Sequence, residues 1–115
     1  MKYYFITLSF IFTSLMSFSQ IEEQLKEKIM DANYFFYNEE YEKALPILRD
    51  ILKDDPNNAD INFKTGRCYQ LLPFEAGRSI SYFEKAITNI SRNYVEGSYK
   101  ERSAPISALY HLANA

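Results

Sequence analysis

The amino-acid sequence predicts an all-α protein, and three observations lead to this prediction. From Ile21 onward, apolar residues recur at spacings of three and four, which places them on one face of a helix. No segment keeps the apolar–polar alternation of a half-buried strand. The apolar stretches are separated by short breaks rich in turn-forming residues, such as 54–58, and Pro cannot continue a helix there. We therefore expect helices joined by short turns.

Residues 1–19 have the features of a secretory signal peptide. Lys2 provides a short basic start, and the run 3–18 is apolar or aromatic apart from Ser and Thr. Ser17 and Ser19 stand at the −3 and −1 positions of a signal-peptidase site, which predicts cleavage before Gln20. The run is short and rich in hydroxyl groups for a membrane span of about 20 apolar residues, so an uncleaved anchor is the alternative. We expect an exported protein without a lipid anchor, since no Cys follows the run directly.

The first two helices after the signal peptide are predicted around residues 25–36 and 41–52. The apolar face of the first consists of Leu25, Ile29, Ala32, Phe35 and Phe36. The face of the second consists of Tyr41, Ala44, Leu45, Leu48, Ile51 and Leu52. Pro46 lies inside the second helix and is expected to bend or destabilise it, because Pro lacks the backbone N–H of the helical ladder.

Three more helices are predicted in the second half of the chain. The third carries Ile61, Phe63, Gly66, Tyr69 and Leu72 and is ended by Pro73. The fourth carries Ile80, Phe83, Ala86, Ile87 and Ile90. The fifth is expected to begin near Ser103, which can cap the first turn, with Pro105 just inside it. Its apolar residues are Ile106, Leu109, Tyr110 and Leu112.

This succession of helices resembles the tetratricopeptide (TPR) family, whose repeat is a helix–turn–helix unit of about 34 residues. The residues that match the family pattern are Ala32, Phe35, Tyr41, Ala44, Leu48 and Pro56 in the first repeat, Gly66, Tyr69, Phe83 and Ala86 in the second, and Leu109, Leu112 and Ala113 in the third. The resemblance implies repeats at about 25–58, 59–93 and 106–115, with 94–105 as an insertion. Small residues in the pattern would let the two helices of a hairpin approach closely.

The resemblance implies a TPR solenoid over residues 20–115, with two and a half repeats and truncated at the C-terminus. A solenoid needs about three repeats and a polar capping element. We therefore expect the chain to be the N-terminal piece of a longer protein. Lys28 and Asp31 stand where the family has apolar residues, so the first helix is expected to be frayed or to act as a cap.

Composition excludes several classes of function. With 13 Lys and Arg against 15 Asp and Glu, the formal charge of −2 offers no basic surface for nucleic acid or for a membrane surface. The single Cys, single His and three Gly give no zinc-site, HExxH, GxSxG or phosphate-loop motif. We expect no enzyme activity, no cofactor and no metal site. Cys68 is expected to be a buried small apolar residue, and His111 a solvent-facing polar residue.

Candidate binding residues follow from the resemblance, because the first helices of successive TPR hairpins line a concave groove. Those that carry aromatic, Arg or amide side chains suited to an interface are Asn33, Phe36, Tyr37, Phe63, Arg67 and Tyr110. The alternative is that Phe36, Phe63 and Tyr110 simply pack against neighbouring repeats. The family's clamp for a carboxyl terminus is not expected, since only Asn33 fits its pattern.

Residues 71–87 and 101–115 are similar to the N-terminal repeats of large bacterial envelope proteins that continue into a propeller and an OmpA-like domain. This similarity implies a protein-interaction scaffold in the periplasm or at the outer membrane. Its partner would be another envelope protein, and any membrane contact would be indirect or through an uncleaved signal peptide. The alternative is glycan capture by a nutrient-binding helical-repeat protein, in which Tyr37, Phe63 and Tyr110 stack on sugar rings.

Overall fold

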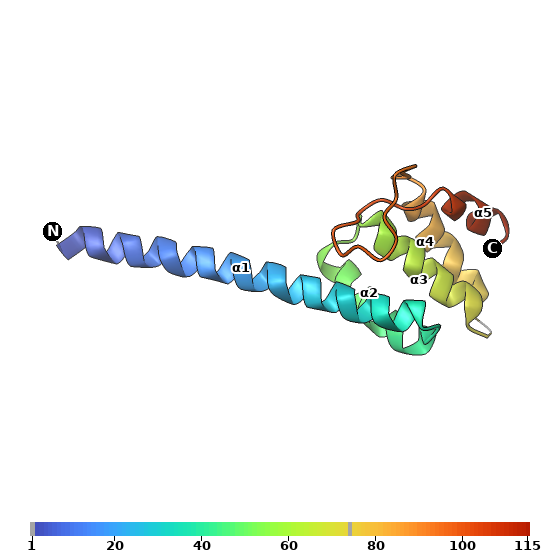
Figure 1. Ribbon diagram of the computed structural model, residues 1–115, viewed down its shortest axis with the longest axis horizontal. Helices are drawn as coiled ribbons and strands as arrows, with labels where there is room; N and C mark the ends of the chain where they lie inside the picture. Colours follow the sequence, from blue (N-terminus) through green and yellow to red (C-terminus); the bar gives the residue numbers. More distant parts are fainter. Residues whose placement is uncertain (1, 74) are drawn as a thin grey trace.

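The part of the chain that the structure describes forms five α-helices and one short 3₁₀ helix. The computed structural model describes the backbone of residues 2–73 and 75–115 and the side chains of 19–73 and 75–115. In chain order the helices are α1 (Lys2–Tyr37), α2 (Tyr41–Asp54), α3 (Ala59–Leu71), η1 (Ala76–Arg78), α4 (Ser79–Ala86) and α5 (Ser107–Ala113) (Figure 1). Over these residues no β-strand occurs, and the only sheet-like pairing is one isolated bridge between Ile90 and Ala104. The all-α prediction is confirmed.

Each helix packs against the next one in the chain, from α1 on α2 to α4 on α5. The N-terminal half of α1 extends away from this bundle, which makes the molecule 67 Å long but only 27 by 21 Å across (Figure 1). Helix α1 continues through Ser19 and Gln20, where cleavage is predicted. Most of the predicted signal peptide, residues 1–18, lies outside the described side chains. Among the helices described, none is long and apolar enough to cross a membrane.

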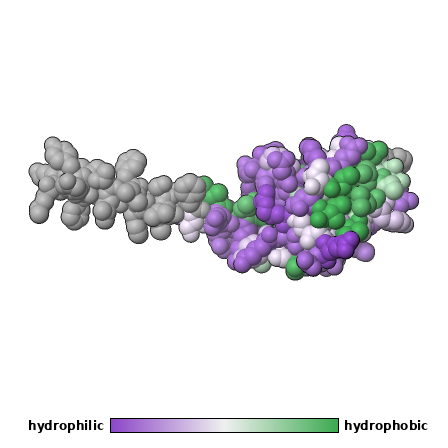
Figure 2. Space-filling view, turned by 90° about the horizontal axis from the view of Figure 1, so that it is seen from above, coloured by the Kyte–Doolittle hydropathy of each residue, from purple (hydrophilic) through white to green (hydrophobic). Residues whose placement is uncertain are grey.

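Two apolar clusters form the core, and α3 contributes to both. The first lies between α1, α2 and α3 and contains Ile29, Ala32, Ala44, Leu48, Ile51, Ile61 and Cys68. The second joins α3 to α4 and α5 and contains Ala59, Phe63, Phe83, Ala86, Ala104 and Ala108. Because other elements cover it on several sides, α3 is buried along nearly its whole length, from Ala59 to Tyr69. Figure 2 shows a mostly hydrophilic surface with an apolar patch at the end that holds α4 and α5.

The contact between α3 and α4 depends on a glycine. A Cβ atom added at Gly66 would lie 2.8 Å from two ring carbons of Phe83, closer than real Cβ atoms approach other atoms. Ala32 and Ala44, the small residues of the first hairpin, are fully buried. The prediction that small residues allow close helix approach is therefore confirmed at Gly66.

Helix α4 is shorter than predicted, because it ends at Ala86 and not at Ile90. The Thr88 hydroxyl donates to the Lys85 carbonyl, a local side-chain bond that competes with a further helical turn. Beyond it the chain pairs with a distant segment: the Ala104 N–H donates to the Asn89 carbonyl at 2.8 Å. The apolar periodicity alone predicts a helix through Ile90, but the pairing of residues 89–91 with Ala104 ends the helix earlier.

Two further expectations about local structure need correction. Ser103 does not cap α5, which begins at Ser107; the Ser103 hydroxyl donates to the Glu101 carboxylate instead. The first helix is not frayed at Lys28, whose ammonium group forms a 2.8 Å ion pair with Asp50 of α2. Helix α2 runs continuously over 14 residues through the exposed Pro46, and the loss of stability or bend expected there stays a prediction.

Candidate binding groove

The segment that connects α4 to α5, residues 87–106, crosses the faces of α1 and α3. The Ala59 N–H donates to the Arg102 carbonyl at 3.0 Å, and the Arg102 guanidinium donates to both oxygens of Asp55. On α1, the Lys26 ammonium group lies 4.8 Å from the centre of the Tyr99 ring. We call this segment the α4–α5 loop. It includes the predicted insertion 94–105, and it covers part of the groove predicted from the TPR resemblance.

A buried ion pair lies beneath the loop. The Lys64 ammonium group is 2.9 Å from a carboxylate oxygen of Asp60 one helical turn earlier, and both side chains are 1% exposed. Lys64 also donates to the Asn33 side-chain carbonyl at 2.7 Å and lies 5.4 Å from the centre of the Tyr37 ring. The Tyr94 hydroxyl donates to the second oxygen of Asp60. We call Asn33, Asp60, Lys64 and Tyr94 the sealed network.

Each charge in the sealed network has partners, as the burial of charges requires. Burial raises the pKa of Asp60, while Lys64 and the Tyr94 hydroxyl oppose that rise. Burial and the nearby Asp60 carboxylate raise the pKa of Tyr94. The Asn33 amide donates to the Gly97 carbonyl at 3.3 Å, which joins the network to the loop. Asn33 therefore holds the fold together in this structure, and its polar atoms are already engaged.

Next to the sealed network, an open pocket of about 390 Å³ lies at the end of the loop. It is lined by Phe36, Tyr37, Glu39, Tyr41, Phe63, Arg67, Tyr94, Glu96, Pro105, Ser107 and His111. These residues come from α1, α2, α3, α5, the turn after α1 and the loop, so the pocket exists only in the folded chain. Four of the six candidates predicted from the sequence meet here: Phe36, Tyr37, Phe63 and Arg67.

Arg67 is the cation of the open pocket and is only partly engaged. One terminal nitrogen, Nη1, donates to the Gln70 side-chain oxygen at 2.8 Å and lies 3.2 Å from His111 Nδ1. The other guanidinium nitrogens have no hydrogen-bond partner among the described side chains. Since guanidinium groups only donate, Arg67 can bind an additional acceptor in the pocket.

His111 is not the solvent-facing residue expected from the sequence. Its ring is stacked on Phe83, with centroids 6.0 Å apart, and lies 5.8 Å from Phe63. Burial lowers the pKa of His111, and the neighbouring Arg67 lowers it further. A neutral imidazole that accepts from Arg67 at Nδ1 carries its proton on Nε2. The last helix therefore closes one side of the pocket with an aromatic wall that is neutral at pH 7.

The aromatic candidates differ in exposure. Tyr37 is 40% exposed, and burial, followed by the nearby Asp60 charge, raises its pKa to about 12. Phe36 is half-buried and packs edge-on against Tyr37 and Tyr41, at 5.2 and 5.9 Å. Phe63 is 8% exposed and belongs to the second core cluster, as the packing alternative proposed. Tyr110 lies on α5, next to His111, but it is 68% exposed and does not line the pocket.

Glu39 lies at the edge of the pocket in a strained backbone conformation. Its φ of 61° is in the left-handed region, which costs little only for glycine. The N–H groups of Glu39 and Glu40 donate to the carbonyls of Phe36 and Phe35, the bonds of a Schellman motif that ends α1. Together with Glu96 of the loop, Glu39 gives the pocket an acidic edge.

Several residues of this region were not among the binding candidates predicted from the sequence. Asp60 and Lys64 stand four residues apart on one helix, a spacing that favours an ion pair and was the available signal. Tyr94 and Glu96 lie in a loop whose path no local pattern predicts. Glu39 offered no signal either, because Gly or Asn is the usual residue in a left-handed helix end.

Two further features bear on chemistry. Cys68 is buried, as predicted, and burial raises the pKa of its thiol to about 12, so it is not a reactive thiolate at neutral pH. Among the described side chains, no group of three or more His, Cys, Asp and Glu residues is placed to hold a metal ion. The arrangement of the open pocket, with aromatic walls, one cation and two carboxylates, is suited to binding.

Comparison with known proteins gives no match: no protein-family model, no curated protein and no solved structure is significantly similar to this chain.

Proposed function

We propose that this chain is a TPR-like protein-interaction module that holds a segment of a partner protein in the open pocket. The observation that supports this proposal most is the meeting of Phe36, Tyr37, Phe63 and Arg67 in one pocket. Aromatic and Arg side chains are enriched among the residues that contribute most to protein interfaces. The proposal includes no catalytic role for the pocket.

The lining of the pocket indicates what the partner offers. A volume of about 390 Å³ suits one or two side chains of a peptide segment and is far too small for a folded domain. The rings of Phe36 and Tyr37 would cover an apolar or aromatic side chain. The remaining Arg67 donors would bind a carboxylate or a backbone carbonyl next to it. We therefore propose a partner segment with an apolar side chain adjacent to an acidic one.

We further propose that the module works in the bacterial cell envelope. This part of the proposal rests on the signal-peptide features of residues 1–19 and on the similarity of residues 71–87 and 101–115 to envelope-protein repeats. If it is correct, the protein purified from its host begins at Gln20 and is found in the envelope fraction. Mass spectrometry of the intact protein tests the cleavage, and a protein that retains Met1 in the cytoplasm would contradict the proposal.

Glycan capture is the less favoured alternative. It requires Tyr37, Phe63 and Tyr110 to present their rings together to a sugar. Phe63 is 8% exposed, and Tyr110 is outside the pocket that the other two line. No feature of the described residues brings these three rings to one surface.

Peptide selection followed by affinity measurement tests the proposed pocket. A displayed peptide library is selected on the 115-residue chain, and the enriched peptides are measured by fluorescence anisotropy. Arg67→Ala is expected to weaken binding by about 30-fold or more, the usual effect of a central Arg in an interface. Tyr37→Ala is expected to weaken it by about tenfold.

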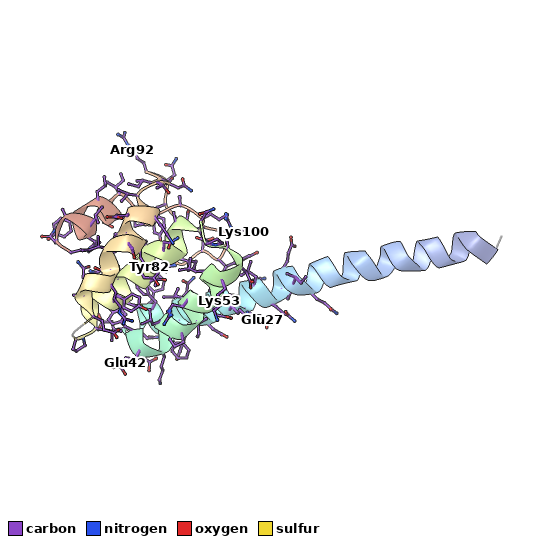
Figure 3. The ribbon with its side chains drawn as sticks, turned by 180° about the vertical axis from the view of Figure 1, so that it is seen from behind. Glu27, Glu42, Lys53, Tyr82, Arg92 and Lys100 are labelled. Atoms are coloured by element: carbon purple, nitrogen blue, oxygen red, sulfur yellow. The ribbon has the colours of Figure 1, made fainter. Side chains whose placement is uncertain are left out.

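The matched control is Arg92→Ala, an exposed arginine in the loop that projects away from the molecule (Figure 3). The affinity of the Arg92→Ala variant for the selected peptides should remain within about twofold of the wild type, because the substitution removes the same charge outside the pocket. Equal losses in Arg67→Ala and Arg92→Ala would show general electrostatic attraction and contradict the proposal. Circular dichroism of each variant separates loss of binding from loss of fold.

A further inference from the structure

A second pocket, of about 250 Å³, lies between α2 and α4 and is separate from the open pocket. Its lining is Arg49, Leu52, Lys53, Pro56, Asn62, Tyr82 and Lys85, none of which lines the open pocket. Figure 3 shows Lys53 and Tyr82 on the same face of the molecule. We call it the basic pocket, because three of its seven residues are cationic.

The three cations of the basic pocket form no direct ion pair with a carboxylate among the described side chains. The ion pairs among the described side chains engage Lys28, Lys43, Lys64 and Arg102. Arg49, Lys53 and Lys85 take part in none of them, and all three residues are exposed. In a chain with a formal charge of −2, this is a local excess of positive charge on residues from two helices. Like charges held together repel each other unless a counterion is bound.

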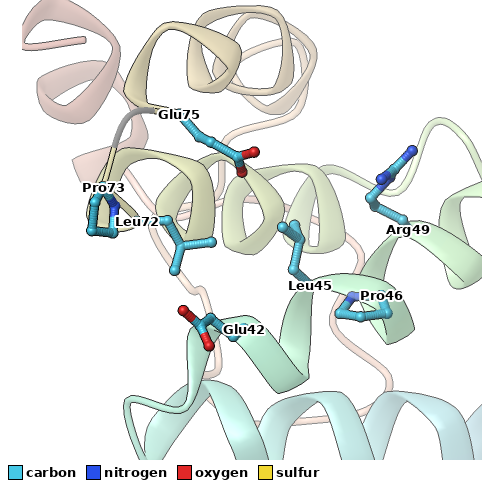
Figure 4. A pocket seen from close by; sticks show the side chains of 7 residues that line it. All are labelled: Glu42, Leu45, Pro46, Arg49, Leu72, Pro73 and Glu75. Atoms are coloured by element: carbon cyan, nitrogen blue, oxygen red, sulfur yellow. The ribbon is translucent and has the colours of Figure 1, made fainter.

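Arg49 also borders an adjoining pocket of about 410 Å³ that contains the carboxylates of Glu42 and Glu75. Figure 4 shows the Arg49 guanidinium directed away from both carboxylates. The acidic side chains of the adjoining pocket therefore do not hold Arg49, and it contributes its charge to the basic pocket.

The rest of the basic pocket is lined by one aromatic ring, one amide and two apolar residues: Tyr82, Asn62, Leu52 and Pro56. The Tyr82 ring is stacked on Tyr69 at 5.4 Å, and the Arg78 guanidinium lies 6.0 Å from the centre of the Tyr69 ring. Burial raises the pKa of Tyr82, and the Tyr69 hydroxyl adds to the rise, so the Tyr82 hydroxyl remains a donor at neutral pH. The Asn62 amide donates to the carbonyls of Pro56 and Asn58, each at 3.0 Å, which holds the wall below the α2–α3 turn in place.

We infer that the basic pocket binds a phosphate group. Two lysines and one arginine from α2 and α4 line the pocket together with Tyr82, and their donors suit an anion with several oxygens and up to two charges. A single carboxylate would satisfy fewer of these donors. The same chemistry can come from a small phosphate compound or from the headgroup of a phospholipid, and the two sources are separated by experiment.

Titration of the full chain with pyrophosphate at constant ionic strength tests this inference. Backbone amide NMR signals of α2 and α4 are expected to shift with saturation, and equal concentrations of chloride should have no such effect. Lys85→Gln is expected to weaken binding by about fivefold or more, since it removes one charge-assisted hydrogen bond. Lys43→Gln, an exposed lysine outside the pocket, is the matched control and should change binding less than twofold.

A second arm uses vesicles of zwitterionic lipid with and without an anionic phospholipid. Sedimentation with the anionic vesicles that is lost in Lys85→Gln and reduced by pyrophosphate would identify a lipid headgroup as the source. Binding of pyrophosphate without vesicle binding would identify a soluble phosphate compound. The inference is overturned if pyrophosphate does not saturate the chain, or if Lys43→Gln and Lys85→Gln weaken binding equally.

Discussion

The sealed network and the open pocket are neighbours that share Tyr94, yet their polar groups have different roles. Under the α4–α5 loop, Lys64 and Asp60 are 1% exposed and their polar atoms are bonded within the chain. Beyond the loop, Arg67 retains donors without partners and Tyr37 is 40% exposed. This difference shows that the residue types on a helical face do not by themselves determine its role. What covers the face decides whether its polar groups stabilise the fold or remain available to a partner.

The largest expected effect comes from breaking the sealed network. Lys64→Ala leaves the Asp60 carboxylate buried without its cation, which should lower the free energy of unfolding by about 3–5 kcal/mol. Lys43→Ala removes a lysine from an exposed pair with Glu40 and should cost less than about 0.5 kcal/mol. Urea unfolding followed by circular dichroism measures both. Similar costs for the two variants would contradict the sealing of Lys64 by the loop.

A smaller effect is expected at the contact that positions α3 between the two regions. Gly66→Ala places a methyl group 2.8 Å from ring carbons of Phe83 and should destabilise the chain by about 1–2 kcal/mol. This is a net value, because alanine also favours the helix over glycine by about 1 kcal/mol. Gly77→Ala is the matched control, since a Cβ there meets no atom within 4 Å. The midpoint of thermal unfolding should fall for Gly66→Ala alone.

The pKa values of two carboxylates that the loop binds, Asp60 and Asp55, should be shifted in opposite directions. Burial raises the pKa of Asp60, so the folded state binds its proton more tightly and stability from this group falls as pH rises through that pKa. Hydrogen bonds from Arg102 lower the pKa of Asp55. The stability that Asp55 contributes is therefore present above its ordinary pKa and is lost as pH falls through the lowered pKa. Carboxyl carbon NMR shifts measured against pH check both directions. Asp55→Asn should reduce the acid-side loss by up to about 1 kcal/mol, as expected for a partly exposed pair. An Asp60 pKa below its ordinary value would contradict the sealed arrangement.

The smallest effect is expected at the edge of the open pocket. Glu39→Gly relieves the left-handed backbone at φ 61° and should raise the free energy of unfolding by about 0.5 kcal/mol. Glu40→Gly, at the next position with a φ of −91°, should be neutral or destabilising. Denaturant unfolding of both variants tests this. If Glu39→Gly were also destabilising, the strain inferred at the pocket edge would be wrong.

The fold class was predictable because it depends on periodic patterns. The TPR resemblance, and not the spacing alone, had pointed to Phe36, Phe63 and Arg67, which the structure places around one pocket. The end of α3 before Pro73 was also predicted, since Pro interrupts the helical hydrogen bonds. In contrast, the early end of α4 depends on pairing between residues 89–91 and 104, which are distant in sequence.

The sequence by itself determined that the chain is helical and where α2 and α3 lie along it. Local hydrogen-bond chemistry and side-chain spacing are sufficient for those properties. Only the tertiary structure decided that the α4–α5 loop seals Asn33 into a buried network and that His111 closes the open pocket. The physical reason is that burial and electrostatics depend on which distant segments meet, and no local pattern specifies the path of a loop.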